Sequence, residues 1–100
     1  MPAEGVRALG ADDRIQTVPR QVSAEVHGET VILQVETGRY YGLDEVGSRV
    51  WNMLDQPRTP REIADRLVEE FDVDRERCEA DLDDLLRGFL ERKLIQFVDQ

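Results

Sequence analysis

Residues 36–55 read ETGRYYGLDEVGSRVWNMLD, and the pattern of the chain changes within them. Before this stretch apolar residues alternate, as they do in strands, and after it they recur at helical spacing. Thr37-Gly38 predicts a turn, residues 39–43 predict a short aromatic strand, and Asp44 is a suitable N-cap for a helix. The stretch therefore joins a strand half to a helical half, and it brings an exposed strand edge beside the helices.

Two more strands are predicted on the N-terminal side of this stretch. Residues 21–27 alternate, and their two valines and Ala24 share one face that we expect to be half-buried. Residues 28–29 are expected to form a two-residue hairpin turn with glycine first. Residues 30–36 carry apolar side chains on both faces, which suits the middle strand of three. The strand at 39–43 then has one neighbour, so its outer edge is open to pairing with another chain.

Three helices are predicted on the C-terminal side. Thr59, Pro60 and Glu62 match a capping box with proline at the first helical position, and Asp74 is the expected N-cap of a third helix at about 75–93. The apolar positions of that third helix spread wider than a one-sided stripe. Either the helix is deeply buried, or one edge of the stripe is free to contact something else. The predicted fold class is α+β: a three-stranded antiparallel sheet followed by three helices, similar to a winged helix-turn-helix.

Length and charge restrict the function classes. One hundred residues suit one small domain, and we expect a flexible arm over 1–20 and a folded domain over 21–98. The net charge of -9 repels phosphate backbones, so we expect no nucleic-acid partner and favour a cationic or apolar peptide. With no apolar run of membrane-spanning length and no signal peptide, we expect a cytoplasmic protein without membrane contact.

Residues suited to catalysis are scarce. His27 and Cys78 are single and far apart in sequence, which predicts no metal site and no cofactor. The sequence holds neither a glycine-rich phosphate loop nor a nucleophile elbow. We therefore expect a binding module with no catalytic residues rather than an enzyme.

The run from Thr30 to Asp55 resembles the coenzyme PQQ synthesis protein D (PqqD) family, as do PRTPREI at 57–63, FDVD at 71–74 and the closing stretch at 85–95. Members of that family recognise the leader segment of ribosomally made, post-translationally modified peptides (RiPPs) and deliver it to a modifying enzyme. The resemblance implies that a leader adds as a strand to the third strand and lies against the third helix. It implies a peptide-binding surface made of Arg39, Tyr40, Tyr41, Gly42, Leu43, Asp81, Leu82, Asp84, Leu85, Leu86 and Phe89.

Two branches of the family remain open at this point. The run at 40–51 looks more like the stand-alone recognition proteins of lasso-peptide biosynthesis, whose partners are a precursor leader peptide and a leader peptidase or other maturation enzyme. The alternative branch is a PQQ biosynthesis peptide chaperone that works with a radical SAM enzyme. Outside the family, the alternatives are a winged-helix transcriptional regulator and a structural subunit that dimerises by sharing its edge strand or its arm.

Overall fold

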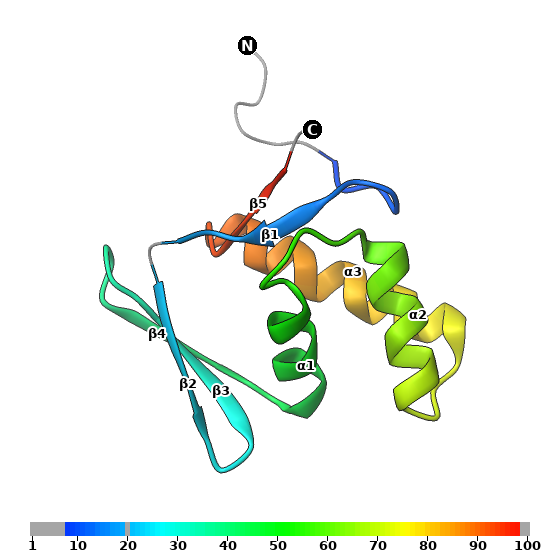
Figure 1. Ribbon diagram of the computed structural model, residues 1–100, viewed down its shortest axis with the longest axis horizontal. Coiled ribbons are helices and arrows are strands. Elements are labelled where there is room, and N and C mark those ends of the chain that lie inside the picture. Colours follow the sequence, from blue (N-terminus) through cyan, green and yellow to red (C-terminus); the bar gives the residue numbers. More distant parts are fainter. Residues whose placement is uncertain (1–7, 20, 99–100) are drawn as a thin grey trace.

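The structure of the chain is a computed structural model that describes residues 8–19 and 21–98. Its elements, shown in Figure 1, are β1 (Ile15–Thr17), β2 (Gln21–Val26), β3 (Glu29–Gln34), β4 (Arg39–Leu43), α1 (Glu45–Met53), α2 (Pro60–Glu70), α3 (Arg75–Glu91) and β5 (Ile95–Phe97). The predicted α+β class, with three strands before three helices, is confirmed.

The main sheet is antiparallel, in the order β2-β3-β4. Within the described residues β4 pairs with β3 alone, from Thr30 opposite Leu43 to Gln34 opposite Arg39. The outer edge of β4 is therefore unpaired, as the sequence predicted, and its backbone groups on that side are available to another strand.

The turn between β2 and β3 differs from the prediction by one residue. Val26 pairs with Glu29, so the turn residues are His27 and Gly28, with φ of 53° and 83°. Positive φ at both positions is what a type I′ hairpin requires, and its twist matches that of the strands. Gly28 is therefore the second turn residue and not the first, a place where its φ of 83° costs no steric strain. His27, which was expected at the end of the strand, is the first turn residue.

The two faces of the sheet are buried very unequally. Ile32 is 0% and Thr30 5% exposed on the face toward the helices, whereas Val22 is 57% exposed on the other face. The expectation that the β2 valines lie on a half-buried face was therefore wrong. The register pairs Ser23 with Ile32 and Val22 with Leu33, so the apolar face of β2 lies on the side away from the helices. Alternation separates the faces of a strand, but it does not say which face the helices cover.

A second, two-stranded sheet joins the chain ends to the core. β1 pairs with β5 in antiparallel register, with Gln16 opposite Gln96, and the side chain of Ile15 is fully buried. Ile15 also exchanges two backbone hydrogen bonds with Arg58, at 2.9 and 3.0 Å. The arm was expected over residues 1–20, and the structure describes residues 8–19 of it. Strand β1 lies in that part. Residues 1–7 and 20 are outside the described part.

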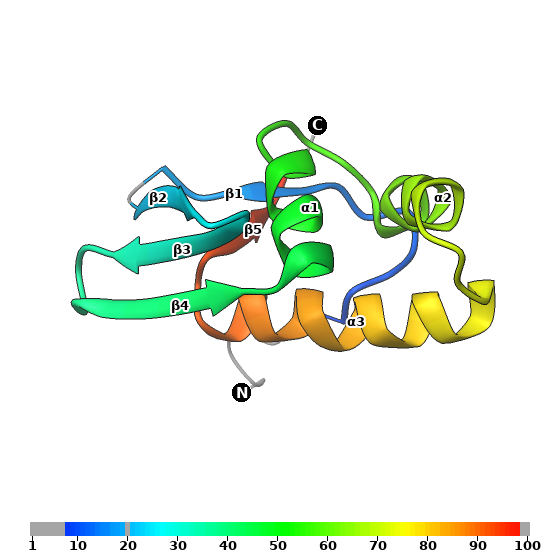
Figure 2. The same cartoon turned by 90° about the horizontal axis from the view of Figure 1, so that it is seen from below.

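The helices begin where the sequence predicted. Asp44, Thr59 and Asp74 each accept a hydrogen bond from the backbone amide three residues on, and Glu62 completes the capping box of α2. Trp51 of α1 is 5% exposed and meets the ring of Phe89 of α3 edge-on at 5.4 Å. Figure 2 shows α3 running from beneath α2 to beneath β4, so this helix spans both halves. Among the described helices none is both long and apolar enough to cross a bilayer.

Candidate functional site

A groove lies between the open strand β4 and helix α3. It has a volume of about 530 Å³ and is bordered by residues 40–43 of β4 and by Asp84, Leu85, Gly88, Phe89 and Arg92 on the helical side. We call it the edge groove. Because it runs beside the unpaired edge of β4, a peptide strand added to that edge would also contact the side chains of α3.

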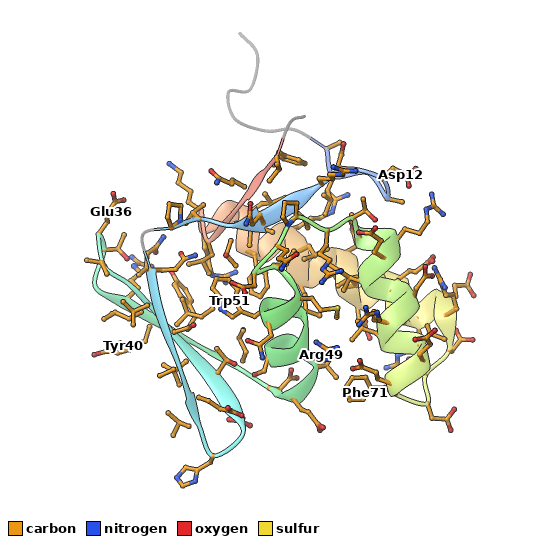
Figure 3. The ribbon with its side chains drawn as sticks, viewed as in Figure 1. Asp12, Glu36, Tyr40, Arg49, Trp51 and Phe71 are labelled. Carbon is orange, nitrogen blue, oxygen red and sulfur yellow. The ribbon has the colours of Figure 1, made fainter. Side chains whose placement is uncertain are left out.

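The two tyrosines of β4 point to opposite faces of the sheet. Tyr41 pairs with buried Ile32 and is half-buried on the helical side, where Arg92 lies over its ring at 5.5 Å from the centroid. Tyr40 is 71% exposed on the outer face, and Figure 3 shows its side chain directed away from the helices. Both tyrosines border the edge groove, but of the two only Tyr41 directs its side chain toward α3.

A second cavity continues the groove toward the N-terminus of α3. This helix pocket, of about 460 Å³, lies between α1, α2 and α3; it is lined by Val46, Val50, Leu67, Phe71, Val73, Asp74, Arg77, Cys78, Asp81, Leu82 and Leu85. Leu85 borders both cavities, so they form one surface. Val46 and Val73 are 40% and 44% exposed, which leaves apolar surface at the rim of the pocket. Its chemistry suits an apolar or aromatic side chain.

Cys78 lies on the wall of the helix pocket. The thiol is free and the residue is 8% exposed. Burial raises the pKa of the Cys78 thiol, the cation of Arg75 lowers it, and the carboxylates of Glu79 and Asp81 raise it further. The group is therefore a neutral, inert part of the apolar wall at neutral pH, as a buried cysteine usually is.

At the Arg92 end of the edge groove, a set of hydrogen bonds links the sheet to the end of α3. Gln34 of β3 donates from Nε2 to the carbonyl oxygen of Arg92 at 2.8 Å, and its Oε1 accepts from the Tyr41 hydroxyl at 3.4 Å. Thr37 donates to the same Oε1 at 3.0 Å. This link fixes Tyr41 and the end of α3 relative to each other, and so sets the width of the groove.

The predicted site residues fall into four groups. Residues 40–43, Asp84, Leu85 and Phe89 border the edge groove, and Asp81 and Leu82 border the helix pocket. Arg39 lies at the start of β4, beyond the groove and beside Tyr41 in a neighbouring hollow. Leu86 is fully buried on the core side of α3, so the structure does not bring it to the surface with the others.

Several lining residues were not predicted from the sequence. Val46 of α1 and Phe71, the residue that ends α2, border the helix pocket. Val73, between α2 and α3, borders the helix pocket, and Arg92, the C-cap of α3, borders the edge groove. A valine between two aspartates, as Val73 is, was the available signal, because an apolar residue in a polar turn needs a covering contact.

The described residues contain no group of three or more His, Cys, Asp or Glu side chains close enough to hold a metal ion. The arginines of α3 are engaged with carboxylates: Arg75 with Asp65 and Glu79, each at 2.8 Å, and Arg87 with Asp83 at 2.6 Å. The chemistry of this surface is thus strand pairing and apolar contact.

An open edge strand beside an apolar groove defines a small α+β domain suited to binding an extended peptide. The chain belongs to the family of coenzyme PQQ synthesis protein D (PqqD), whose family model matches residues 29–95. None of the curated proteins matches this sequence.

Three solved structures share the fold. TbiB1, in a structure described as "in complex with the TbiA(beta) leader peptide", is 39% identical, with a TM-score of 0.76, over 85% of this chain and 99% of that one. A lasso peptide synthetase B1 complexed with its leader peptide is 22% identical, with a TM-score of 0.73, over 82% of this chain and 96% of that one. The PqqD truncation of Methylobacterium extorquens PqqCD, described as a stand-alone RiPP recognition element, is 23% identical, with a TM-score of 0.74, over 89% and 95% of the two chains. The last two similarities establish the fold alone.

Proposed function

We propose that this protein binds the leader segment of a ribosomally synthesised precursor peptide and presents it to a leader peptidase or other maturation enzyme of lasso-peptide biosynthesis. The single observation that carries the proposal is the unpaired edge of β4 beside the edge groove. The protein acts by recognition, as its family does, and the chemistry belongs to the partner enzyme.

Backbone pairing supplies the first part of the binding energy. The leader adds as a further strand along Arg39–Leu43 and satisfies backbone groups that the sheet leaves open. Such hydrogen bonds depend little on side chains, so they give affinity without selecting one sequence.

Selectivity comes from side chains that reach α3. Alternate leader side chains point toward the edge groove, and the helix pocket beyond Leu85 receives an apolar or aromatic one. A well-buried anchor of this kind is worth about 2 kcal/mol or more, whereas exposed carboxylates such as Asp84 add about 0–1 kcal/mol each. The apolar anchor therefore dominates the choice of peptide.

The identity of 39% with TbiB1, whose structure holds a leader peptide, supports leader binding by this chain. The run at 40–51, which resembles the recognition proteins of lasso-peptide biosynthesis, favours that branch over PQQ synthesis. A DNA-binding role is disfavoured by the charge. Arg75 and Arg87 of α3 are held in ion pairs, and the chain carries a net charge of -9. Phosphate contacts need free cations along the helix that enters the groove.

Fluorescence anisotropy tests the proposal. The labelled probe is the leader segment of the precursor peptide encoded nearest to this gene, titrated with the protein. We expect saturable binding at micromolar concentration or tighter, lost when a Tyr-x-x-Pro element of the leader is changed. Absence of binding by a folded protein would contradict the proposal, and binding that ignores that element would point to another peptide class.

A further inference from the structure

Three cations gather at the end of the edge groove where β4 begins. Arg39 opens β4, and Arg92 and Lys93 follow the last turn of α3; all three border one hollow of about 430 Å³ with Tyr41. Their side chains are exposed. In the described ranges none of the three forms an ion pair, which sets them apart from the paired arginines of α3.

The position of Arg92 is built into the helix. Its Nη1 donates to the carbonyl oxygen of Gly88 at 3.1 Å, and a Cβ at position 88 would come within 2.8 Å of that atom. Glycine at 88 thus leaves room for the guanidinium to fold back over Tyr41 and border the edge groove. A cation held at a groove wall by its own helix is poised to meet a ligand.

The opposite end of the groove carries acids. Asp84, the residue before Leu85, borders the edge groove, and Asp81, about one turn earlier, borders the helix pocket beyond it. The Arg92 guanidinium folds back to Gly88, one turn from Asp84, so this cation lies nearest to the acids. Asp84 and Asp81 do not border the hollow of Arg39 and Lys93, so a bound side chain in that hollow responds mainly to its cations.

We infer that the cations Arg39, Arg92 and Lys93 select a peptide strand that carries an acidic side chain at the Arg39 end of its pairing with β4. This inference rests on the proposed leader binding and specifies the class of leader. All pairings within the main sheet are antiparallel. A peptide that adds in the same sense has its C-terminal end beside Arg39, so the acid lies on the C-terminal side of the paired segment.

The hollow also contains acidic side chains. Glu36 and Glu91 also border it, so the local balance is three cations against two carboxylates. Arg39 belongs to β4 itself and Arg92 borders the edge groove, whereas Glu36 and Glu91 do neither, so a strand that pairs with β4 meets these two cations before the acids. The acidity of the whole chain favours peptides that are apolar or basic elsewhere.

The test is a display selection of random twelve-residue peptides on the immobilised full chain. We expect the selected peptides to share an alternating apolar pattern with Asp or Glu enriched on its C-terminal side. The double variant Arg39→Gln/Lys93→Gln should lose that enrichment and bind a selected peptide about fivefold more weakly, with a smaller salt dependence. Arg39→Glu should exchange the preference for Lys or Arg at the same position.

Arg87→Gln is the matched control, because Arg87 is exposed on the same helix and is paired with Asp83. It should leave the acid preference unchanged. An apolar pattern without any acid preference would overturn this inference and leave the proposed function standing. Failure to enrich any peptide would overturn both.

Discussion

Leu85→Arg should abolish leader binding while leaving the fold intact. Leu85 borders both the edge groove and the helix pocket and is half-buried in the free protein. Full burial of a leucine is worth about 1.5–3 kcal/mol, so covering its exposed half by a peptide contributes about 1 kcal/mol. Placing a guanidinium against the same apolar surface adds a desolvation cost. Together these terms exceed about 2 kcal/mol, a loss of affinity of about 30-fold or more.

The assay is the anisotropy titration of the labelled leader, with a thermal melt of each variant. Arginine forms helices as well as leucine does, and the half-exposed position lets it reach water, so the melting temperature should change little. Leu90→Arg is the matched control, since Leu90 is also half-buried on α3 but borders neither cavity. Asp84→Ala should cost at most about fivefold. Equal losses for Leu85→Arg and Asp84→Ala would refute the ranking of apolar over ionic contacts.

Three further predictions concern the core, one ion pair and the buried cysteine. Ile32→Ala should lower the free energy of unfolding by about 2–4 kcal/mol in urea titrations and Val22→Ala by less than about 0.5 kcal/mol, because only Ile32 is buried; equal effects would contradict the assignment of the faces. The hydrogen bond from Arg49 holds the pKa of Glu70 below its ordinary value of 4.5, so this pair stabilises the fold above that pH and its contribution is lost as the pH falls below it. The pair is about a third exposed, so Glu70→Gln should cost no more than about 0.5 kcal/mol at pH 7, and this cost should shrink as the pH falls through the lowered pKa of Glu70. Burial raises the pKa of the Cys78 thiol, so its alkylation by iodoacetamide at pH 7.5 should be far slower than in urea, and slower again with leader bound; a rate equal to that of the unfolded chain would contradict the burial.

The helix boundaries could be predicted because capping is local chemistry. Asp44, Thr59 and Asp74 each accept a backbone hydrogen bond from a residue three positions on, so the signal lies within one turn. The open edge of β4 could also be predicted, since three strands joined by tight turns leave two outer edges, and the third runs directly into a helix.

Long-range contacts could not be predicted in the same way. The pairing of Ile15 with Phe97 joins the two ends of the chain, and neither three-residue strand has a pattern that marks its partner. The buried face of β3 was equally undetermined, because Ile32 and its neighbours Val31 and Leu33 are all apolar. Arg92 entered the groove through the absence of a side chain at Gly88, which only the packed helix reveals.

Hydrogen exchange of the backbone amides in Arg39–Leu43, measured with and without the leader peptide, tests strand addition most directly. In the free protein the amides on the outer edge of β4 have no strand partner and should exchange quickly. With saturating leader, the account predicts that these amides become strongly protected, together with those of the peptide segment that pairs with them. Leader binding that protects other parts of the protein and leaves the exchange of β4 unchanged would contradict the account.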